Sequence, residues 1–353
     1  MKVLYDHQAF VLQSNGGISR YIVEVASRIK AFELAEVTVF GGLHVNNHLR
    51  YAEKSISPFG FYFNRPWRGQ RLINDLIWNL GALSASADIY HATYYHPLTP
   101  PRGAKVFLTV HDLIDEKFRR DDPRYVSLLK RKAKVISDSD FILCNSNSTR
   151  RDLLDYYQVS AEKVGVTHLA ASEVFRPARP DTERRNFLLF VGSRASYKNY
   201  TLLRQAYESF DFLYKEYEIL CFGGGPLVAN EIPCRGVARH MTGNDEDLAR
   251  LYNEAAVFVY PSIYEGFGIP VLEALRCNCP VVSGSTSSLP EVGGNFVNYF
   301  DCMSIESLAE VLESVLKLGN AATMNDGLFD WTNSFSWDAC AKATTVFYRK
   351  VLS

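Results

Sequence analysis

Two glutamates stand eight positions apart in the stretch YEGFGIPVLEAL, residues 264–275. Proline favours the first turn of a helix, so Pro270 predicts that a helix begins here, with Ile269 at its cap. Glu265 would then project from the loop before the helix, and Glu273 would lie one turn inside it. Because carboxylates accept hydrogen bonds from sugar hydroxyls and the free amides of a helix start attract phosphate, the two side chains could hold opposite ends of one ligand. The alternative is that Glu273 is only a favourable first-turn acid and Glu265 a charge in a loop.

A second candidate is the loop VGSRASYKN, residues 191–199, at the end of an apolar segment. Asn199 is expected to cap the helix that follows, and Arg194 and Lys198 lie in the loop before it. A guanidinium and an ammonium beside a helix N-terminus suit a diphosphate, because the first is a bidentate donor and the second a point charge. The alternative is an exposed loop whose charges are solvated.

Two glycines in SNGGISRY, residues 14–21, form a third candidate. A helix is expected to begin near Ile18, because apolar residues recur after it with the helical period. Gly16 and Gly17 would let the backbone approach a phosphate at that helix start, or would only make a tight turn.

The fourth candidate is His111 in VHDLI, residues 110–114. It follows the strand candidate 105–110 and is expected to face a crevice rather than the core. An imidazole there could hydrogen-bond a sugar hydroxyl or move a proton, although a lone histidine more often satisfies a local partner. Asp112 beside it would orient the ring or cap the next turn.

Short β-rich apolar runs alternate with helical patterns over almost the whole chain, which indicates parallel α/β architecture. Ligands of such sheets bind beyond the carboxyl ends of the strands, which is where the four candidates fall. The expected strands are 2–6, 36–40, 88–92, 105–110 and 140–145 in the first half and 186–192, 217–223, 257–262 and 279–284 in the second.

Each half of the chain could build its own sheet. The segment 168–186, with Pro177, Pro180 and a run of charged residues, is the expected linker. The predicted parts are an N-terminal domain at 1–170, a C-terminal domain at 185–335 and a last helix at 336–353 that packs back toward the N-terminal domain.

The composition limits the classes of function. The chain has 353 residues, with 38 basic and 39 acidic side chains and a net charge of −1, so its overall charge does not favour nucleic acid. The seven cysteines form no CxxC pair and are expected to be reduced thiols rather than disulfides or zinc ligands. The first residues lack the apolar core of a signal peptide, and no apolar run reaches the roughly 18 residues that span a bilayer, so a cytosolic protein is expected.

Taken together, these motifs resemble those of the retaining, nucleotide-sugar-dependent glycosyltransferases of family 4. GGISRY, HDLI, RASYKN, FGGGP (222–226) and EGFGIPVLE occur in the family's order along nearly the whole chain. The resemblance implies the GT-B fold, in which two Rossmann-like domains face each other across an interdomain cleft. It also implies a hexosyltransferase that needs no metal ion and no cofactor besides its donor substrate.

The family's functional residues can be carried over to the matching positions. The resemblance implies that Glu265 contacts the hydroxyls of the donor sugar and that His111 touches the sugar near its anomeric carbon. Arg194 and Lys198 would neutralise the diphosphate leaving group, and Glu273 would hold the nucleotide ribose. The residues expected around the donor nucleotide are Gly16, Gly17, Arg194, Lys198, Gly266, Phe267, Gly268, Ile269 and Glu273.

For mechanism, the resemblance implies retention at the anomeric carbon, with the leaving diphosphate taking the acceptor proton on the same face. The DxD-like sequences at 138–140 and 245–247 resemble metal motifs of another glycosyltransferase fold, but their places before a strand and at a helix start favour capping or surface acids. The expected donor is GDP-mannose or a related GDP-sugar, as in members that act in bacterial polysaccharide and O-antigen assembly.

Three other classes remain for comparison. A non-catalytic nucleotide-sugar-binding protein or a GT-B phosphorylase would keep the same fold. A nicotinamide-dependent dehydrogenase would need GxGxxG after the first strand, which SNGGIS does not supply.

The N-terminal half is expected to receive a saccharide or a lipid-linked acceptor. Basic residues are frequent at 117–134, and 59–78 interleaves aromatic residues with Arg65, Arg68 and Arg71. Such a surface could rest on anionic lipid at the inner face of the membrane. A solvated helix face and a packed loop would explain the same residues equally well.

Overall fold

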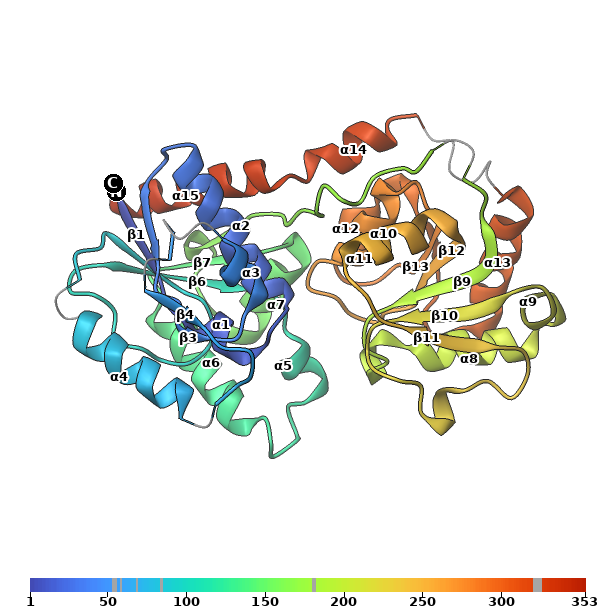
Figure 1. Cartoon of the computed structure of the whole chain (residues 1–353), viewed down its shortest axis with the longest axis horizontal. Helices are drawn as coiled ribbons and strands as arrows, with labels where there is room; N and C mark the ends of the chain where they lie inside the picture. The colour runs from blue at the N-terminus through green and yellow to red at the C-terminus, as the bar shows by residue number, and fades with distance from the viewer. Residues whose placement is uncertain (53–55, 58, 68, 83–84, 180–181, 320–325) are drawn as a thin grey trace. The chain divides into compact units, whose positions relative to one another are not determined.

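The computed structural model describes all residues except 53–55, 58, 68, 83–84, 180–181 and 320–325. The described residues form two compact units, one made of Met1–Leu169 with Ser336–Ser353 and the other of Ala170–Phe335. The chain therefore enters the second unit within the expected linker and returns to the first unit for its last helix (Figure 1). Pro180 of the linker and Arg68 of the aromatic segment lie outside the described residues.

The first unit contains a parallel sheet with the strand order β2-β1-β5-β6-β7-β8, and a separate parallel pair, β3-β4. Five strands of the main sheet match expected ones, and β8 was not foreseen. The strands are β1 Lys2–Tyr5, β2 Glu36–Val39, β3 Gly42–His44, β4 Gly60–Tyr62, β5 Ile89–Ala92, β6 Lys105–Val110, β7 Phe141–Cys144 and β8 Val164–Val166. The helices are α1 Gln8–Leu12, α2 Gly17–Ala31, α3 Asn47–Tyr51, α4 Gln70–Ala82, α5 Ile114–Phe118, α6 Val126–Asp138, α7 Asn147–Tyr157 and α15 Trp337–Leu352.

Burial explains why the central strands of this unit are continuous apolar runs. Every residue of β5 and β7 is buried, as expected for parallel strands that are covered on both faces. The last helix, α15, packs against α2, where Nε of Arg28 donates to Asp338 at 2.7 Å. Its Tyr348 hydroxyl lies 2.8 Å from that of Tyr5 in β1, so the end of the chain is part of the first unit's core.

The second unit contains a parallel sheet with the order β11-β10-β9-β12-β13-β14. The four expected strands are present, and the short strands β11 and β14 at its two ends were not foreseen. The strands are β9 Arg185–Val191, β10 Glu218–Phe222, β11 Ala238–Met241, β12 Ala255–Tyr260, β13 Val281–Gly284 and β14 Asn298–Phe300. The helices are α8 Tyr200–Ser209, α9 Asp211–Glu216, α10 Asp245–Glu254, α11 Ile269–Arg276, α12 Leu289–Gly293, α13 Ile305–Leu318 and α14 Leu328–Ser334.

Helices cover both faces of this second sheet. Val257 and Val259 of β12 belong to the core cluster that contains residues of α8 and α13. Phe258, which points to the opposite face, packs its ring edge-on against Tyr252 of α10 at 5.2 Å. Both faces of β12 are therefore buried, and its carboxyl end is where side chains can reach a ligand.

Two local expectations were wrong in detail. The cap of α11 is Gly268, with φ of 96°, so Ile269 is already inside the helix. Asn199 does precede α8, but its side chain does not cap that helix; it donates to the carbonyl of Cys302 at 2.9 Å. Within the part of the chain that the structure describes, no helix is both long and apolar enough to cross a membrane.

Candidate functional site

The carboxyl ends of four neighbouring strands, β10, β9, β12 and β13, lie side by side in the second unit. The chain goes from β9 to β10 on one side, and β12 pairs with β9 on the other. This is the point at which the order of the strands reverses, where open α/β sheets bind ligands. The loops after β9 and β12 carry Lys198 and Glu265, respectively.

Lys198 and Glu265 are brought into direct contact at this edge. Nζ of Lys198 lies 2.7 Å from Oε1 of Glu265 and 2.7 Å from the hydroxyl oxygen of Tyr260, the last residue of β12. The two charged side chains are only 12% and 10% exposed. Burial and the neighbouring Glu265 carboxylate raise the pKa of Tyr260 well above its ordinary value, so its hydroxyl stays protonated. The cluster thus offers a cation, a carboxylate and a hydroxyl at the end of one strand.

Two serines hold the loop that carries Glu265. The amide of Glu265 donates to Oγ of Ser287 at 2.9 Å, and Oγ of Ser288 lies 2.9 Å from the carbonyls of both Glu265 and Phe267. Sequence reasoning did not single out these serines. Ser287 and Ser288 follow β13, which pairs with β12. This pairing was the feature that could have indicated that they lie near the loop of Glu265.

Gly268 is needed at the end of the same loop. Its φ of 96° is a conformation that residues with a side chain rarely adopt, and a Cβ atom would lie 2.7 Å from Leu289. The backbone at Gly268 therefore constrains how Gly266 and Phe267 lead into α11, which begins at Ile269. The first amides of α11 belong to the residues that are expected to bind the donor.

Glu273 is placed apart from the loop, one turn inside α11. Glu273 is a buried residue, with an exposed fraction of 6%, and the Tyr252 hydroxyl from α10 lies 3.3 Å from Oε2. Glu273 thus lies one turn inside the helix, as the sequence predicts, and because α11 has no acid in its first turn the alternative of a first-turn acid is wrong.

Arg194 occupies a different position from the one expected. Its side chain is 3% exposed, and Nε donates to Glu231 at 2.7 Å. Its terminal nitrogens donate to the carbonyl oxygens of Gly223, Gly224, Gly225 and Pro226. The guanidinium therefore holds the glycine-rich loop after β10 and does not stand free beside Lys198. This loop needs glycine at 224, where φ is 72° and a Cβ would meet the Gly192 carbonyl at 2.4 Å.

The remaining candidates belong to the first unit. Gly16 caps α2 with an extended backbone and φ of −172°, and a Cβ atom on Gly17 would meet no atom within 4 Å. The backbone conformation does not require these glycines, and the space in front of Gly17 is open to an incoming group.

His111 is half-buried after β6, with its ring edge-on to that of Tyr21 at 5.2 Å. Burial and the nearby Lys132 ammonium lower the pKa of His111 to about 3, so the ring is neutral near pH 7. Asp112 accepts from the amide of Ile114 at 3.0 Å and so caps the next turn, one of the two roles foreseen for it.

The acidic triplets have local partners. Asp140 accepts from the amide of Val106 at 2.8 Å, and Asp247 forms a capping box with Asn244 at the start of α10. Among the residues that the structure describes, no three or more His, Cys, Asp or Glu side chains are grouped so that they could hold a metal ion.

Comparison with known proteins agrees with this architecture. Residues 15–170 match the model of "Glycosyltransferase Family 4", and residues 172–325 match that of "Glycosyl transferases group 1". The chain is 26% identical to the O-antigen chain mannosyltransferase B of Escherichia coli over 94% of this chain and 96% of that protein.

Two solved structures show the same fold over nearly the whole chain. Sucrose-phosphate synthase of Thermosynechococcus elongatus superposes with a TM-score of 0.74 at 16% identity, covering 100% of this chain and 99% of that one. HepE of Anabaena, solved in complex with UDP and glucose, gives a TM-score of 0.71 at 14% identity and covers 97% of each chain. Two Rossmann-like units of this kind define a GT-B glycosyltransferase. With both halves matched, the chain belongs to the family 4 glycosyltransferases and is mannosyltransferase-like.

Proposed function

We propose that the chain transfers mannose or a related hexose from a GDP-linked donor to a saccharide or lipid-linked saccharide acceptor, in polysaccharide or O-antigen synthesis. The observation that carries the proposal is the Lys198–Glu265 pair at the switch point of the second sheet. The mannose is suggested by the relative named as an O-antigen mannosyltransferase.

The roles follow from the chemistry of the side chains. Lys198 balances the diphosphate charge, while Glu265 accepts hydrogen bonds from the donor sugar and Glu273 from the ribose. The amides from Gly266 to Ile269 bind the donor, and Arg194 acts through the glycine-rich loop that it holds. In the first unit, the backbone at Gly16 and Gly17, which is open in front of Gly17, receives phosphate, and neutral His111 accepts a hydrogen bond from a sugar hydroxyl.

The reaction proceeds with retention and without a metal ion. The bond from the anomeric carbon to the diphosphate oxygen breaks, and a bond to the acceptor oxygen forms on the same face. The acceptor proton passes to the leaving diphosphate. Stabilising the leaving diphosphate is the main catalytic task, so replacing Lys198 should lower the transfer rate more than replacing any other residue of the site.

Thermal unfolding with nucleotides tests the donor. At a concentration about 100 times the dissociation constant, a ligand stabilises the folded state by about 2.7 kcal/mol, which corresponds to a rise in Tm of about 4 °C. GDP and GDP-mannose should give this rise with and without EDTA, whereas UDP and ADP should not. A rise in Tm with UDP alone would show that the donor carries uridine rather than guanosine. If EDTA abolished the rise in Tm, donor binding would need a metal ion.

Product analysis tests the reaction. An α-linked product from an α-linked donor, assigned by the one-bond carbon–proton coupling at the anomeric carbon, is expected for retention. Donor binding without transfer would favour a non-catalytic nucleotide-sugar-binding protein. Release of hexose 1-phosphate that depends on added phosphate would favour a phosphorylase.

We also propose peripheral contact between the first unit and the inner face of a membrane. The support is an apolar surface on and around α4, made of Phe59, Phe61, Phe63, Trp67, Leu72, Leu76, Ile77 and Leu80, all of them exposed. Leu72, Leu76 and Leu80 recur at four-residue spacing on α4 with exposures of 74%, 60% and 69%. Asp75, the one acid in the sequence from 59 to 81, is mostly covered, so anionic lipid would meet little repulsion from this surface.

The basic segment 117–134 contributes less than its composition suggests. Lys132 is buried, and its Nζ lies 2.9 Å from Glu116. Lys117 pairs with Asp152 at 2.8 Å, and other charges of the segment also have local partners. The proposed membrane contact therefore rests on the α4 surface.

A further inference from the structure

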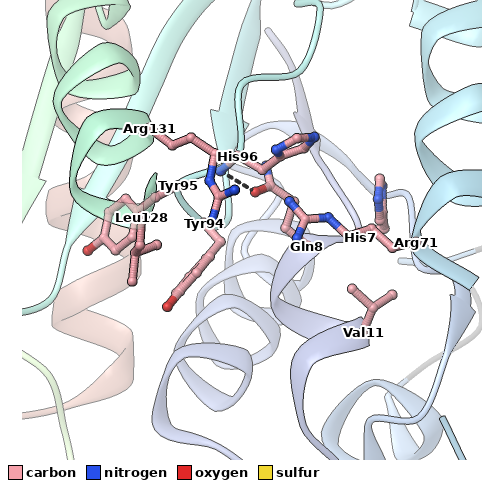
Figure 2. Close-up of a pocket in the computed structure, with 9 residues that line it drawn as sticks. All are labelled: His7, Gln8, Val11, Arg71, Tyr94, Tyr95, His96, Leu128 and Arg131. Carbon is pink, nitrogen blue, oxygen red and sulfur yellow. Dashed lines mark hydrogen bonds between the residues drawn. The ribbon is translucent and has the colours of Figure 1, made fainter. Parts of the chain in front are cut away.

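Two hollows of different character adjoin helix α4 in the first unit. Near the start of α4 lies a small polar pocket, where Figure 2 shows Arg71 together with His7, His96 and Arg131. Its volume is about 20 Å³, little more than one water molecule needs. Beneath the second half of α4 lies a larger groove of about 380 Å³, a volume typical of sites that bind small molecules. The groove is therefore the hollow beside α4 that has room for a ligand.

The groove separates the second half of α4 from one face of the sheet, at strands β1 and β2. Most of the side chains in its walls are apolar; the principal wall residues are Leu4, Thr38, Phe40, Phe59, Ile77 and Trp78. The ring of Phe40, which follows β2, packs against that of Trp78 in α4 with 5.6 Å between the ring centres. The indole nitrogen of Trp78 donates to the carbonyl of Thr99 at 2.9 Å. Both rings are thus held in place before any ligand binds.

The sheet is incompletely covered where the groove lies. Along β1, Val3 and Tyr5 are buried, whereas Leu4, which points to the other face, is only half-buried. β2 shows the same pattern, with Thr38 half-buried between two buried valines. Parallel sheets are normally covered on both faces, as β5 and β7 are in this unit. The groove is thus a gap in the cover of the sheet, and a ligand in it would remove apolar surface from water.

The inside of the groove offers little to a polar ligand. Its charged lining residues are Lys2 and Glu36, the first residues of β1 and β2, and their side chains are 51% and 70% exposed. They lie at the rim and face each other, with 4.0 Å between Nζ of Lys2 and the Glu36 carboxylate. Among the described residues that line the groove, no buried polar side-chain atom lacks a hydrogen-bond partner. The walls therefore favour a hydrocarbon.

The groove is continuous with the exposed apolar surface around α4. Phe59 and Ile77 line the groove and also belong to that surface, where they are 60% and 47% exposed. A lipid layer that rests on the α4 surface would therefore also cover the opening of the groove. A hydrocarbon chain could then pass from the layer into the groove without crossing water. Because the chain is in apolar surroundings in both places, the gain comes from the groove walls, which lose their contact with water.

We propose that the groove binds one acyl chain of a membrane phospholipid, an inference that rests on the membrane contact given above for the first unit. The chain lies along the half-covered face of β1 and β2, beneath Ile77 and Trp78, and its head group stays outside the apolar walls. It completes the cover of the sheet at Leu4 and Thr38. Burial of this chain adds to that of the leucines on the outer side of α4, so the first unit is held on the lipid surface by two separate contacts.

Binding of fatty acids below their micelle concentrations to the full chain tests the groove. In calorimetric titrations with octanoate, decanoate and laurate, the affinity should rise about fourfold for each added methylene group, which corresponds to about 0.8 kcal/mol. An affinity that does not depend on chain length would overturn the proposal. ω-Bromoundecanoate should quench the fluorescence of Trp78, because bromine quenches an indole that it contacts. The quenching should fall in Trp78→Phe and persist in Trp67→Phe, the matched control for an exposed tryptophan outside the groove. The reverse result would overturn the proposal.

Variants that fill the groove give a second test. Gly81→Leu fills it from α4, because Gly81 lines the groove and a Cβ atom there would meet no atom within 4 Å. Thr38→Phe fills it from the sheet. Each should weaken decanoate binding at least about tenfold, since losing the room for two methylene groups already has an effect of that size. The GDP-induced rise in Tm should persist in both variants and shows that they are folded.

Leu72→Ser is the matched control for these variants, because Leu72 is an exposed residue of α4 that does not line the groove. It should bind decanoate as the wild type does. Loss of decanoate binding in Leu72→Ser would place the fatty acid on the outer surface and overturn the proposal, as would wild-type affinity in both filled variants.

Two further arms separate other occupants of the groove. Geraniol and decanol have the same number of carbon atoms, so tighter binding of geraniol would assign the groove to an isoprenoid chain and overturn the acyl assignment. A dimer of the wild type that decanoate dissociates would assign it to a second copy of the chain. Failure of the membrane contact would be seen separately, as decanoate binding without binding to phosphatidylglycerol vesicles. Failure of the donor proposal would appear as a missing GDP-induced rise in Tm in the wild type.

Discussion

Lys198 and Glu265, which are 67 positions apart in the sequence, form an ion pair with 2.7 Å between Nζ and Oε1. The pair joins the loop after β9 to the loop after β12 across the switch point of the sheet. A glutamate that holds the lysine in place before the donor arrives reduces the rearrangement needed when a diphosphate binds. The ion pair therefore preorganises Lys198, which is proposed to balance the diphosphate charge, and Glu265, which is proposed to bind the donor sugar.

Replacing each partner of this pair should have coupled effects on stability. Lys198→Met and Glu265→Gln each leave the other charge mostly buried, so the double variant should be more stable than the sum of the two losses predicts, by about 1–3 kcal/mol. Each single change should lower turnover about 10²–10³-fold, the usual scale for removing one group that stabilises a leaving charge. Urea unfolding and initial transfer rates measure the two effects. Strictly additive unfolding free energies, or an unchanged rate in Glu265→Gln, would contradict the assignment.

The glycine-rich loop after β10 offers a matched pair of substitutions. Gly224 and Gly225 both have positive φ, 72° and 80°, so alanine at either costs about 1–2 kcal/mol of backbone strain. At 224 the new Cβ would also lie 2.4 Å from the Gly192 carbonyl, whereas at 225 it would meet nothing within 4 Å. Gly224→Ala should therefore lower the free energy of unfolding clearly more than Gly225→Ala in urea titrations. Equal losses would show that the approach of the two loops is not constrained.

The sequence predicted the sheets better than it predicted the sites. Continuous apolar runs such as β9 and β12 are recognisable because parallel strands are buried on both faces, while β11 and β14 are short, partly polar strands at the two ends of the sheet. Motif and loop position were sufficient to select Lys198 and Glu265, but not to show that they pair. The hydrogen bonds from Arg194 to backbone carbonyls could not be predicted from the sequence, because every residue type carries a carbonyl.

The pocket residues His7 and Arg131 were missed for a related reason. His7 stands in a segment without a motif, and the pairing of β1 with β5 brings the loop after β1 to the loop after β5, whereas Arg131 belongs to the basic segment 117–134 and is supplied by α6. That pairing follows from the strand order, which hydrophobic patterning does not specify. Sites made from several loops therefore need the topology before they can be recognised.

The stability of the protein should fall in mild acid because of His91. Its ring is fully buried between Thr109 and Tyr348, with Nε2 2.9 Å from the Thr109 hydroxyl, and burial lowers the pKa of His91 to about 3. The unfolded chain takes up this proton near pH 6.5, while the folded chain stays neutral until about pH 3. His91 therefore leaves stability unchanged above pH 6.5 and reduces it by about 1.4 kcal/mol per pH unit between these values.

Urea unfolding of the wild type and of His91→Gln between pH 7.5 and pH 5 measures this contribution. The variant should be less stable at pH 7.5, because its hydrogen bonds are imperfect, but its stability should fall less steeply below pH 6.5. Equal pH slopes in the two proteins would assign the acid sensitivity to other groups.

The apolar surface around α4 should govern attachment to anionic vesicles. Leu72 and Leu76 are exposed, so serine in their place should not unfold the protein, while each loses about 1.5–3 kcal/mol of lipid burial. Leu72→Ser with Leu76→Ser should weaken binding to phosphatidylglycerol-containing vesicles by at least about 10²-fold, measured by co-sedimentation. Met303→Ser is the control, because Met303 is 79% exposed in the second unit. Binding that depends equally on Met303 would indicate nonspecific adsorption, and a concentration-dependent dimer that dissociates in the leucine variants would assign the surface to a second copy of the chain.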